Sequence, residues 1–216
     1  MTLLATRTLS AIVNNFRDSR VQPDPRARAK PGRVAPIELE SAAIRMRPYC
    51  DDDAPLLFTA AVESIETVGR WMPWCHAEYA KTDSIAWVER SRACWQSGEE
   101  YSFALFDRQR DYIGGAGLNH FNRDHNFANL GYWIRQSRQR TGFAVAAVHC
   151  LARFGFETLR LTRIEIVAAV DNIASRRVAE KAGACFECVA RNRLLIHGEP
   201  VAAAVYSLLP PSRPAR

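Results

Sequence analysis

The sequence lacks any apolar run that approaches the roughly 20 residues a membrane-spanning helix needs, and this argues against an integral membrane protein of the helical kind. The stretch from Met1 to Val13 is interrupted by Arg7, and no small-residue cleavage pattern follows it, which argues against a secretory signal. With 48% hydrophobic and 24% charged residues, the composition is that of a soluble globular protein. We therefore expect a cytoplasmic protein without a membrane partner.

Metal and redox motifs are also scarce. The six cysteines contain one CxxC, formed by Cys185 and Cys188, and no second pair or nearby histidine completes a zinc site. Residues three apart on a strand point to opposite faces, so this pair is poorly placed to share a ligand. We expect no metal and interpret the other cysteines as reduced, mostly buried thiols.

Positive charge is concentrated near the ends of the chain. Of the net charge of +6, residues 1–40 carry +3, because seven basic residues there face four acidic ones, and Arg213 and Arg216 add two more. The remainder is nearly neutral and shows no basic stripe, so we expect no direct binding of nucleic acid.

Composition divides the chain into three parts. Residues 20–37 contain four prolines and one glycine among arginine and alanine, which cannot fill a core. We expect a flexible N-terminal extension over 1–40, one domain over 41–209 and a loose C-terminal tail over 210–216. The sequence leaves monomer and homodimer open.

Strands and helices alternate within the expected domain. The predicted strands are 43–47, 101–107, 112–119, 128–134, 163–170, 185–196 and 200–208, and the predicted helices are 51–66, 84–97, 142–157 and 173–182. The helix over 142–157 places five apolar residues on one face: Phe143, Ala147, Cys150, Leu151 and Phe154. This order predicts an α/β domain in which helices cover both faces of a mixed sheet.

A polar loop with three arginines connects the strand 128–134 to the helix that begins at Gly142. Free N–H groups at a helix start point outward, and the helix dipole is positive there, so a diphosphate is a natural ligand. Gly142 would let the backbone approach the phosphates, and Ala144 would keep the first turn unobstructed. The three arginines, Arg135, Arg138 and Arg140, would add charge-assisted contacts. The alternative is a solvated loop that leads into an ordinary helix.

Other phosphate motifs fit less well. The sequence has no GxxxxGK[ST] pattern. Gly115 and Gly117 begin a GxGxxG pattern, but His120 occupies its last position, and both glycines lie inside a predicted strand rather than at a strand-to-helix turn. They indicate instead a place where the sheet is approached closely or bulged.

Asn172 and Ser175 follow the strand 163–170 and begin the next helix. Taken alone, Asn172 is typical of a helix N-cap and Ser175 of a polar first-turn residue. Both nevertheless emerge at the carboxyl end of a central strand, beside the end of the strand that feeds the arginine loop. In open α/β sheets, ligands bind at that edge.

Together these motifs resemble the GNAT superfamily of N-acetyltransferases. The segment from Gln139 to Ala144 matches its acetyl-CoA loop pattern, Q/R-x-x-G-x-G/A. The RimJ/RimL-type branch, which acetylates the N-terminal alanine or serine of ribosomal proteins, is similar at four places: Gly131–Ile134, Thr162–Glu165, Val170–Gly183 and Leu194–Gly198. The resemblance covers about residues 43–208. One departure is Arg140, which stands where many members carry a first glycine.

The resemblance implies a single GNAT domain with a splayed pair of central strands, 128–134 and 163–170, and acetyl-CoA as co-substrate. The pantetheine arm would lie in that gap like an added strand. A backbone N–H near Tyr132–Ile134 would stabilise the oxyanion, and Asn172 would bind the arm. Ser175 would bond to the sulfur and act as the acid or as a stabiliser of the thiolate. The expected acetyl-CoA-binding residues are Trp133, Ile134, Arg135, Gln139, Arg140, Thr141, Gly142, Phe143, Ala144, Asn172 and Ser175.

The resemblance defines the catalytic base and the acceptor site less clearly than the acetyl-CoA site. Some members of this branch use a glutamate on the closing hairpin, which residues 191–197 lack, so Glu165 is the leading candidate for the catalytic base. The alternative for Glu165 is an ion pair with an arginine. His197, Glu78 and a water chain are further candidates. Trp71 and Trp74 would line the acceptor pocket, or would plug a minor core.

Three hypotheses about function follow. The leading one is acetyl transfer, by direct attack in a ternary complex, to the N-terminal alanine or serine of a ribosomal protein. The second is acetylation of a small amine, such as an antibiotic, a polyamine or an amino-acid derivative. The third is a non-catalytic acyl-CoA sensor. Arg140 and the missing hairpin glutamate favour the sensor, whereas the intact Gly142, Asn172 and Ser175 oppose it.

Overall fold

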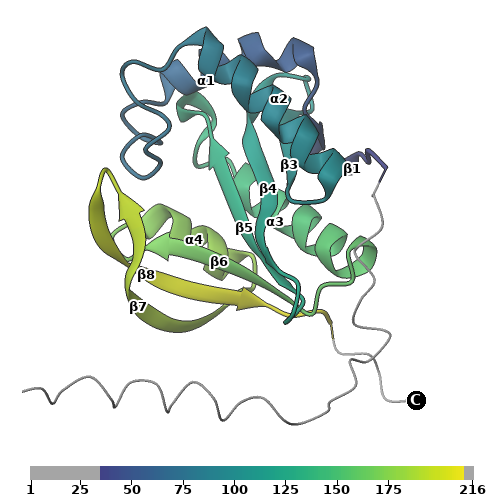
Figure 1. Cartoon of the computed structure of the whole chain (residues 1–216), viewed down its shortest axis with the longest axis vertical. Helices are drawn as coiled ribbons and strands as arrows, with labels where there is room; N and C mark the ends of the chain where they lie inside the picture. Colours follow the sequence, from purple (N-terminus) through teal and green to yellow (C-terminus); the bar gives the residue numbers. More distant parts are fainter. Residues whose placement is uncertain (1–34, 212–216) are drawn as a thin grey trace, which may run out of the picture. The chain divides into compact units, whose positions relative to one another are not determined.

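The computed structural model describes residues 35–211, so most of the expected extension (1–40) and of the expected tail (210–216) lies outside the described residues. Eight strands form one sheet in the order β1-β2-β3-β4-β5-β6-β8-β7 (Figure 1). The strands are β1 (Leu39–Glu40), β2 (Ile44–Pro48), β3 (Tyr101–Asp107), β4 (Tyr112–Asn122), β5 (Phe127–Ile134), β6 (Arg163–Ala169), β7 (Cys185–Ile196) and β8 (Glu199–Leu208). The helices are α1 (Ala54–Glu63), α2 (Lys81–Ser97), α3 (Phe143–Arg153) and α4 (Ile173–Lys181).

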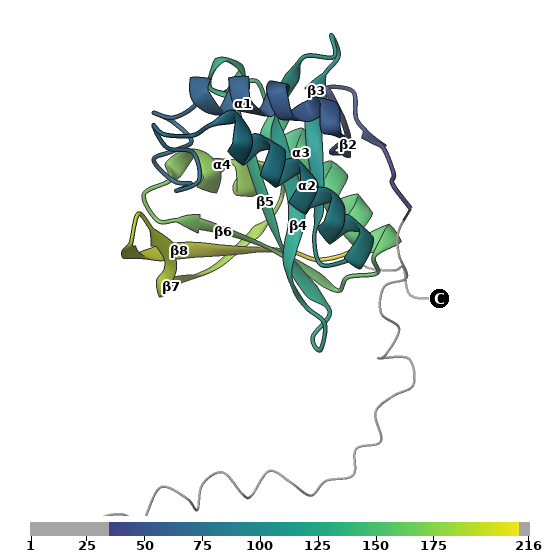
Figure 2. The same cartoon turned by 45° about the horizontal axis from the view of Figure 1, so that its top comes forward.

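The prediction of helices on both faces of the sheet is confirmed, and β3 shows the reason. Phe103 and Leu105 belong to the core cluster that includes α3. Ala104 and Phe106, which alternate with them, belong to a second cluster with residues of α1 and α2. Because successive strand residues point to opposite faces, α1 and α2 cover one face and α3 the other (Figure 2).

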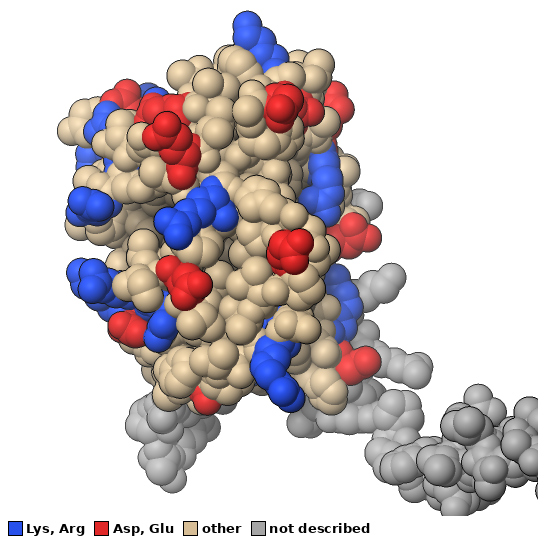
Figure 3. Space-filling view, turned by 90° about the vertical axis from the view of Figure 1, so that its left-hand side faces the viewer, with Lys and Arg blue, Asp and Glu red and all other residues tan. Residues whose placement is uncertain are grey.

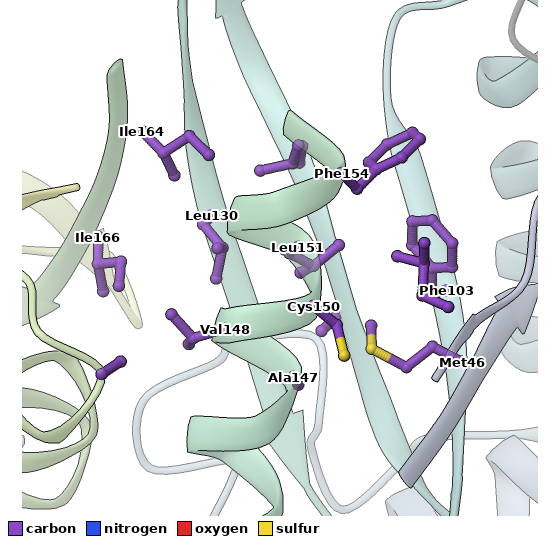
Figure 4. Packing of buried hydrophobic residues seen from close by; sticks show 14 of the residues in the cluster. Met46, Phe103, Leu130, Ala147, Val148, Cys150, Leu151, Phe154, Ile164 and Ile166 are labelled. Carbon is purple, nitrogen blue, oxygen red and sulfur yellow. The ribbon is translucent and has the colours of Figure 1, made fainter. Parts of the chain in front are cut away.

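The larger core lies between α3 and the sheet. Leu151 and Phe154 meet Met46, Phe103 and Leu130 from three different strands (Figure 4). The predicted apolar face of this helix is therefore confirmed. The helix itself ends at Arg153 rather than at Glu157, because the chain continues as a wider π-helical turn over Phe154–Thr158.

The central pair of strands is splayed. All strand neighbours are antiparallel except β5 and β6, which run parallel and pair only over Phe127–Asn129 and Arg163–Glu165. Beyond these residues the two strands diverge, while β6 continues to pair with β8 as far as Ala169. The backbone of β5 after Asn129 therefore faces a gap on the β6 side, as the resemblance implied (Figures 1 and 2).

The strands differ most from the prediction at β4 and β1, and the other strands differ by at most one residue at an end. β4 continues to Asn122 rather than ending at Asn119, since a bulge restores its pairing at Asn122 and Phe127. The two-residue β1 was not predicted, because so short an edge strand has no periodicity to detect.

The six cysteines are all free, and three of the four outside the CxxC pair are buried, as expected. Cys185 and Cys188 are both exposed on β7. Within residues 35–211, no group of three or more His, Cys, Asp or Glu side chains is arranged to hold a metal ion. None of the helices in that part of the chain is both long and apolar enough to cross a membrane.

Candidate active site

The start of α3 is open. Gly142 precedes the helix in a left-handed conformation (φ 86°), and the first bond within the helix joins the Ala146 N–H to the Gly142 carbonyl at 3.1 Å. The N–H groups of Phe143, Ala144 and Val145 therefore have no acceptor within the helix. A β-carbon added to Gly142 would meet no other atom within 4 Å, so the backbone here is accessible to a ligand.

The loop before Gly142 is anchored to the end of α1. The Ser137 N–H donates to the Glu63 carboxylate at 2.7 Å, and the Gln136 N–H donates to Ser64 Oγ at 3.0 Å. The Arg135 guanidinium also pairs with Glu63. These hydrogen bonds, that from Arg135 above all, lower the pKa of Glu63 to about 2, so its carboxylate is charged at neutral pH.

Replacing Glu63 with glutamine should destabilise the protein at neutral pH. Because the folded-state pKa of about 2 lies below the ordinary value of 4.5, Glu63 contributes stability above pH 4.5 that is lost as the pH falls toward 2. We expect the variant to lower the Tm by about 3–6 °C at pH 7 and by progressively less below pH 4.5. Thermal unfolding followed by circular dichroism measures this. Glu89→Gln, on the exposed face of α2, is the matched control, and a Tm difference independent of pH would contradict the role of Glu63.

The three arginines of the loop have different surroundings. Arg135 pairs with Glu63, and Arg138 pairs with Asp107 at 3.1 Å and Asp111 at 2.6 Å. Both guanidinium groups are thus paired with carboxylates of the protein, and these contacts do not support the expectation that Arg135 and Arg138 bind phosphate. Arg140 is exposed and takes part in no ion pair among the described residues. The φ of Arg140 is 65°, a conformation that favours glycine. This explains why many members of the family that the sequence resembles carry glycine at this position.

A groove with a volume of about 720 Å³ extends from the start of α3 to the start of α4. Ten of the eleven expected acetyl-CoA-binding residues line it: Trp133, Ile134, Gln139, Arg140, Thr141, Gly142, Phe143, Ala144, Asn172 and Ser175. Arg138 lines it as well. Arg135 is absent from this lining, whereas Arg177 and Lys181 of α4 belong to it. The ends of β5 and β6 thus face the same groove, as the sequence argument required.

Ser175 has two close polar neighbours. Its N–H donates to Asn172 Oδ1 at 3.0 Å, which confirms the N-cap reading of Asn172 and leaves the amide NH₂ group as a donor for a ligand. The Tyr132 hydroxyl lies 2.9 Å from Ser175 Oγ and donates to the Ser175 carbonyl at 3.0 Å. Burial raises the pKa of Tyr132 to about 12, so this hydroxyl is protonated at neutral pH. The Tyr132 side chain was not singled out from the sequence.

Glu165 is not brought to the groove. It lies on β6 where β5 and β6 still pair, and its carboxylate accepts from Arg163 Nε at 2.9 Å. Glu165 lines neither this groove nor the second cavity described below. Its surroundings therefore match the ion-pair alternative, and the structure gives no support to its expected role as the catalytic base. The other candidates are also engaged, since His197 Nε2 lies 2.9 Å from the Gly69 carbonyl and Glu78 pairs with His76 at 3.3 Å.

A second cavity, of about 500 Å³, lies on the face of the sheet covered by α1 and α2. Its walls include Trp74, Trp87, Tyr49 and Tyr79, and its floor includes glycines of β4 and β5. Trp74 thus lines this cavity, whereas Trp71 lines the groove.

The groove and the cavity meet at three residues. Met72, Tyr132 and Trp133 line both of them. Two ligands, one in each, would therefore approach one another beside the end of β5. Such an arrangement suits transfer of a group from one bound molecule to another.

One face of the molecule, shown in Figure 3, carries charges of both signs. Figure 3 looks onto the side where the α1–α2 connection and the β7–β8 hairpin tip lie, and basic and acidic residues are interspersed on it. This view gives no sign of a basic stripe, in agreement with the charge distribution along the sequence.

Comparisons with known proteins agree with this geometry. Residues 43–184 match the model of the acetyltransferase (GNAT) domain family. YdaF of Bacillus subtilis, provisionally named a ribosomal N-acetyltransferase, is 30% identical over 162 residues, which cover 73% of this chain and 86% of YdaF. A structure from Vibrio cholerae, provisionally assigned as a ribosomal-protein-serine acetyltransferase, is 32% identical with a TM-score of 0.72 and covers 81% of this chain and 98% of that one.

A more distant structure shares the fold. RimL, the α-N-acetyltransferase of ribosomal protein L7/L12, solved with coenzyme A, is 18% identical with a TM-score of 0.74, and the match covers 80% of this chain and 98% of that one.

The match to the family model and the fold define an acyl-group transferase of mixed α/β architecture. The chain belongs to the GNAT family and is an N-acetyltransferase.

Proposed function

We propose that this chain transfers the acetyl group of acetyl-CoA to a primary amine within a ternary complex. The observation that carries the proposal is the groove in which the open start of α3 and the Asn172–Ser175 segment face one another. The free N–H groups at Gly142–Val145 suit the pyrophosphate, and Arg140, Arg177 and Lys181 supply positive charge nearby.

The gap between β5 and β6 suits the pantetheine arm. Beyond Asn129, the backbone of β5 has no β6 partner, so its N–H and C=O groups on that side are available to amide groups of a ligand. The reacting carbonyl would then lie near Tyr132 and Trp133, where the groove meets the cavity.

The chemical step follows from these positions. A neutral amine attacks the thioester carbonyl, a backbone N–H of Tyr132–Ile134 donates to the oxyanion, and the C–S bond breaks as Ser175 donates a hydrogen bond to the departing thiolate. The amine loses its proton to a base or to water. In the lining of the cavity, His76 pairs with Glu78 through Nδ1, and Asp83 accepts from the Ala80 N–H through Oδ2. His76 Nε2 and Asp83 Oδ1 can still accept a proton, and we propose them, in place of Glu165, as candidates for that role.

The relatives and the cavity point to different acceptors. The names of YdaF and of the Vibrio cholerae protein support the N-terminal alanine or serine of a ribosomal protein as the first candidate. A small amine is the second candidate, and the 500 Å³ cavity favours it, because such volumes are typical of small-molecule sites.

Thiol release from acetyl-CoA tests the function. The purified full chain is assayed against peptides that begin with alanine or serine and against a panel of primary amines. Turnover that depends on one of these acceptors supports the proposal. Binding of acetyl-CoA by calorimetry without turnover on any acceptor would support the sensor instead, and absence of binding would overturn both.

A further inference from the structure

The walls of the acceptor cavity are predominantly aromatic. Trp74 lies edge-on to Trp133, with ring centroids 5.3 Å apart, and edge-on to Tyr79 at 5.7 Å. Tyr49 and Trp87 complete the wall, from the segment after β2 and from α2. Aromatic rings contribute large apolar area with little conformational freedom, so they suit the recognition of a flat, apolar ligand.

The floor of this cavity includes three glycines, which have no side chains. Gly117 of β4 pairs with Gly131 of β5, and both line the cavity together with Gly115. A β-carbon on Gly131 would meet only Asn119 Nδ2, at 3.9 Å, so the space above this glycine is empty. The two glycines of β4 in the floor differ from it, because a β-carbon there would collide with protein atoms that already lie close to the strand.

Polar groups in the lining already have partners within the protein. Asp83 accepts from the Ala80 N–H at 2.8 Å, Arg90 pairs with Glu100 at 3.1 Å, and His76 pairs with Glu78 at 3.3 Å.

Several hydroxyl and amide groups of the lining are partnered too. The Tyr49 hydroxyl lies 3.0 Å from that of Tyr112, Tyr79 accepts from Ser84 at 3.0 Å, and Asn119 accepts from Asn129 at 2.8 Å. The lining thus offers a charged or strongly polar ligand few matched partners, whereas an apolar ligand would gain from leaving water.

The size of the cavity exceeds what a small side chain requires. A volume of 500 Å³ lies within the range of sites that enclose drug-sized ligands. The methyl of alanine or the hydroxymethyl of serine would leave most of it to water, although its walls are apolar.

We propose, on the basis of the acetyltransferase function proposed above, that the preferred acceptor is a primary amine attached to a bulky, uncharged and preferably aromatic group. That group lies over Gly131, between Trp74 and Trp87, while the amine reaches the thioester beside Tyr132. The cavity thereby selects acceptors by apolar contact.

A size series of amines tests this inference. Initial rates of thiol release are compared for methylamine, phenethylamine, naphthylmethylamine and short peptides that begin with alanine or serine. We expect kcat/KM for the two aromatic amines to exceed that for methylamine by about 100-fold, and to exceed that for the peptides.

Filling the cavity should erase this preference. Gly131→Leu places a side chain in the empty space and should lower kcat/KM for naphthylmethylamine by about 100-fold, that for methylamine by less than about fivefold, and the acetyl-CoA affinity hardly at all. Gly131→Ala, which adds one carbon at ordinary contact distance, is the matched control and should have an intermediate effect. If Gly131→Leu fails to fold, Trp87→Ala, at a partly exposed wall position on α2, should raise KM about tenfold for the aromatic amines alone.

The outcomes separate this inference from the function it depends on. Faster acetylation of the Ala or Ser peptides than of the aromatic amines would overturn the inference and leave the acetyltransferase function standing. Equal losses for all amines in Gly131→Leu would also overturn it. Binding of acetyl-CoA without turnover on any acceptor would overturn both.

Discussion

Gly142→Val is expected to abolish the binding of acetyl-CoA. The side chain of valine would project from the residue whose backbone opens α3, beside the free N–H groups of Phe143 and Ala144 that we assign to the pyrophosphate. The space in front of Gly142 is empty of protein atoms within 4 Å, so the added atoms would displace ligand rather than core. Calorimetric titration should show a loss of affinity of at least about 100-fold, the equivalent of several charge-assisted hydrogen bonds.

Backbone strain needs its own control in this experiment. Gly142 has a φ of 86°, which a β-branched residue adopts at a cost of about 1–2 kcal/mol. Gly183, after α4, has a φ of 81° and equally open surroundings, so Gly183→Val carries the same strain away from the loop. We expect Gly183→Val to bind acetyl-CoA with nearly normal affinity. Normal affinity in Gly142→Val, or equal loss in both variants, would remove the assignment of the loop.

The order of elements was predictable from the sequence because it rests on local patterns. The alternation in strands such as Tyr101–Asp107 and the apolar face of α3 are repeated signals, and both are confirmed. The splay of β5 and β6 followed only from the resemblance, since nothing local in Phe127–Ile134 indicates where its pairing with β6 stops.

Side-chain partners at long sequence separation were not predictable. Arg135 and Arg138 have the charge that a phosphate prefers, but Glu63, Asp107 and Asp111 lie within reach in the folded chain and pair with them instead. An arginine side chain reaches either kind of anion, so composition alone does not decide between them.

Some contacts of the candidate site have a local signal in the sequence. Glu165 is two residues from Arg163 on the same strand, and residues i and i+2 share a face, so their ion pair could be anticipated. Trp71 and Trp74 indicated a pocket, yet only the fold brings Tyr49 and the glycines of β4 and β5 to the same cavity as Trp74.

Tyr132 and Ser175 should behave as one unit in catalysis. The Tyr132 hydroxyl has one proton and two acceptors, the carbonyl and the Oγ of Ser175. When Tyr132 donates to the carbonyl, Ser175 Oγ–H is drawn toward Tyr132. When Tyr132 donates to Oγ, the serine proton is free to meet the sulfur. Because burial keeps the pKa of Tyr132 at about 12, the tyrosine remains a donor throughout the neutral range.

We therefore expect Ser175→Ala to lower kcat by about 100-fold and Tyr132→Phe by about tenfold, each with little change in the KM for acetyl-CoA. The double variant should be no slower than Ser175→Ala, because without the serine hydroxyl there is no proton for Tyr132 to orient. Steady-state kinetics on the four proteins measures this coupling. Additive losses would show that Tyr132 acts independently of Ser175. An equal loss of kcat and of cofactor affinity in Ser175→Ala would assign that hydroxyl to binding, because a group that acts on the departing thiolate stabilises the transition state more than the ground state.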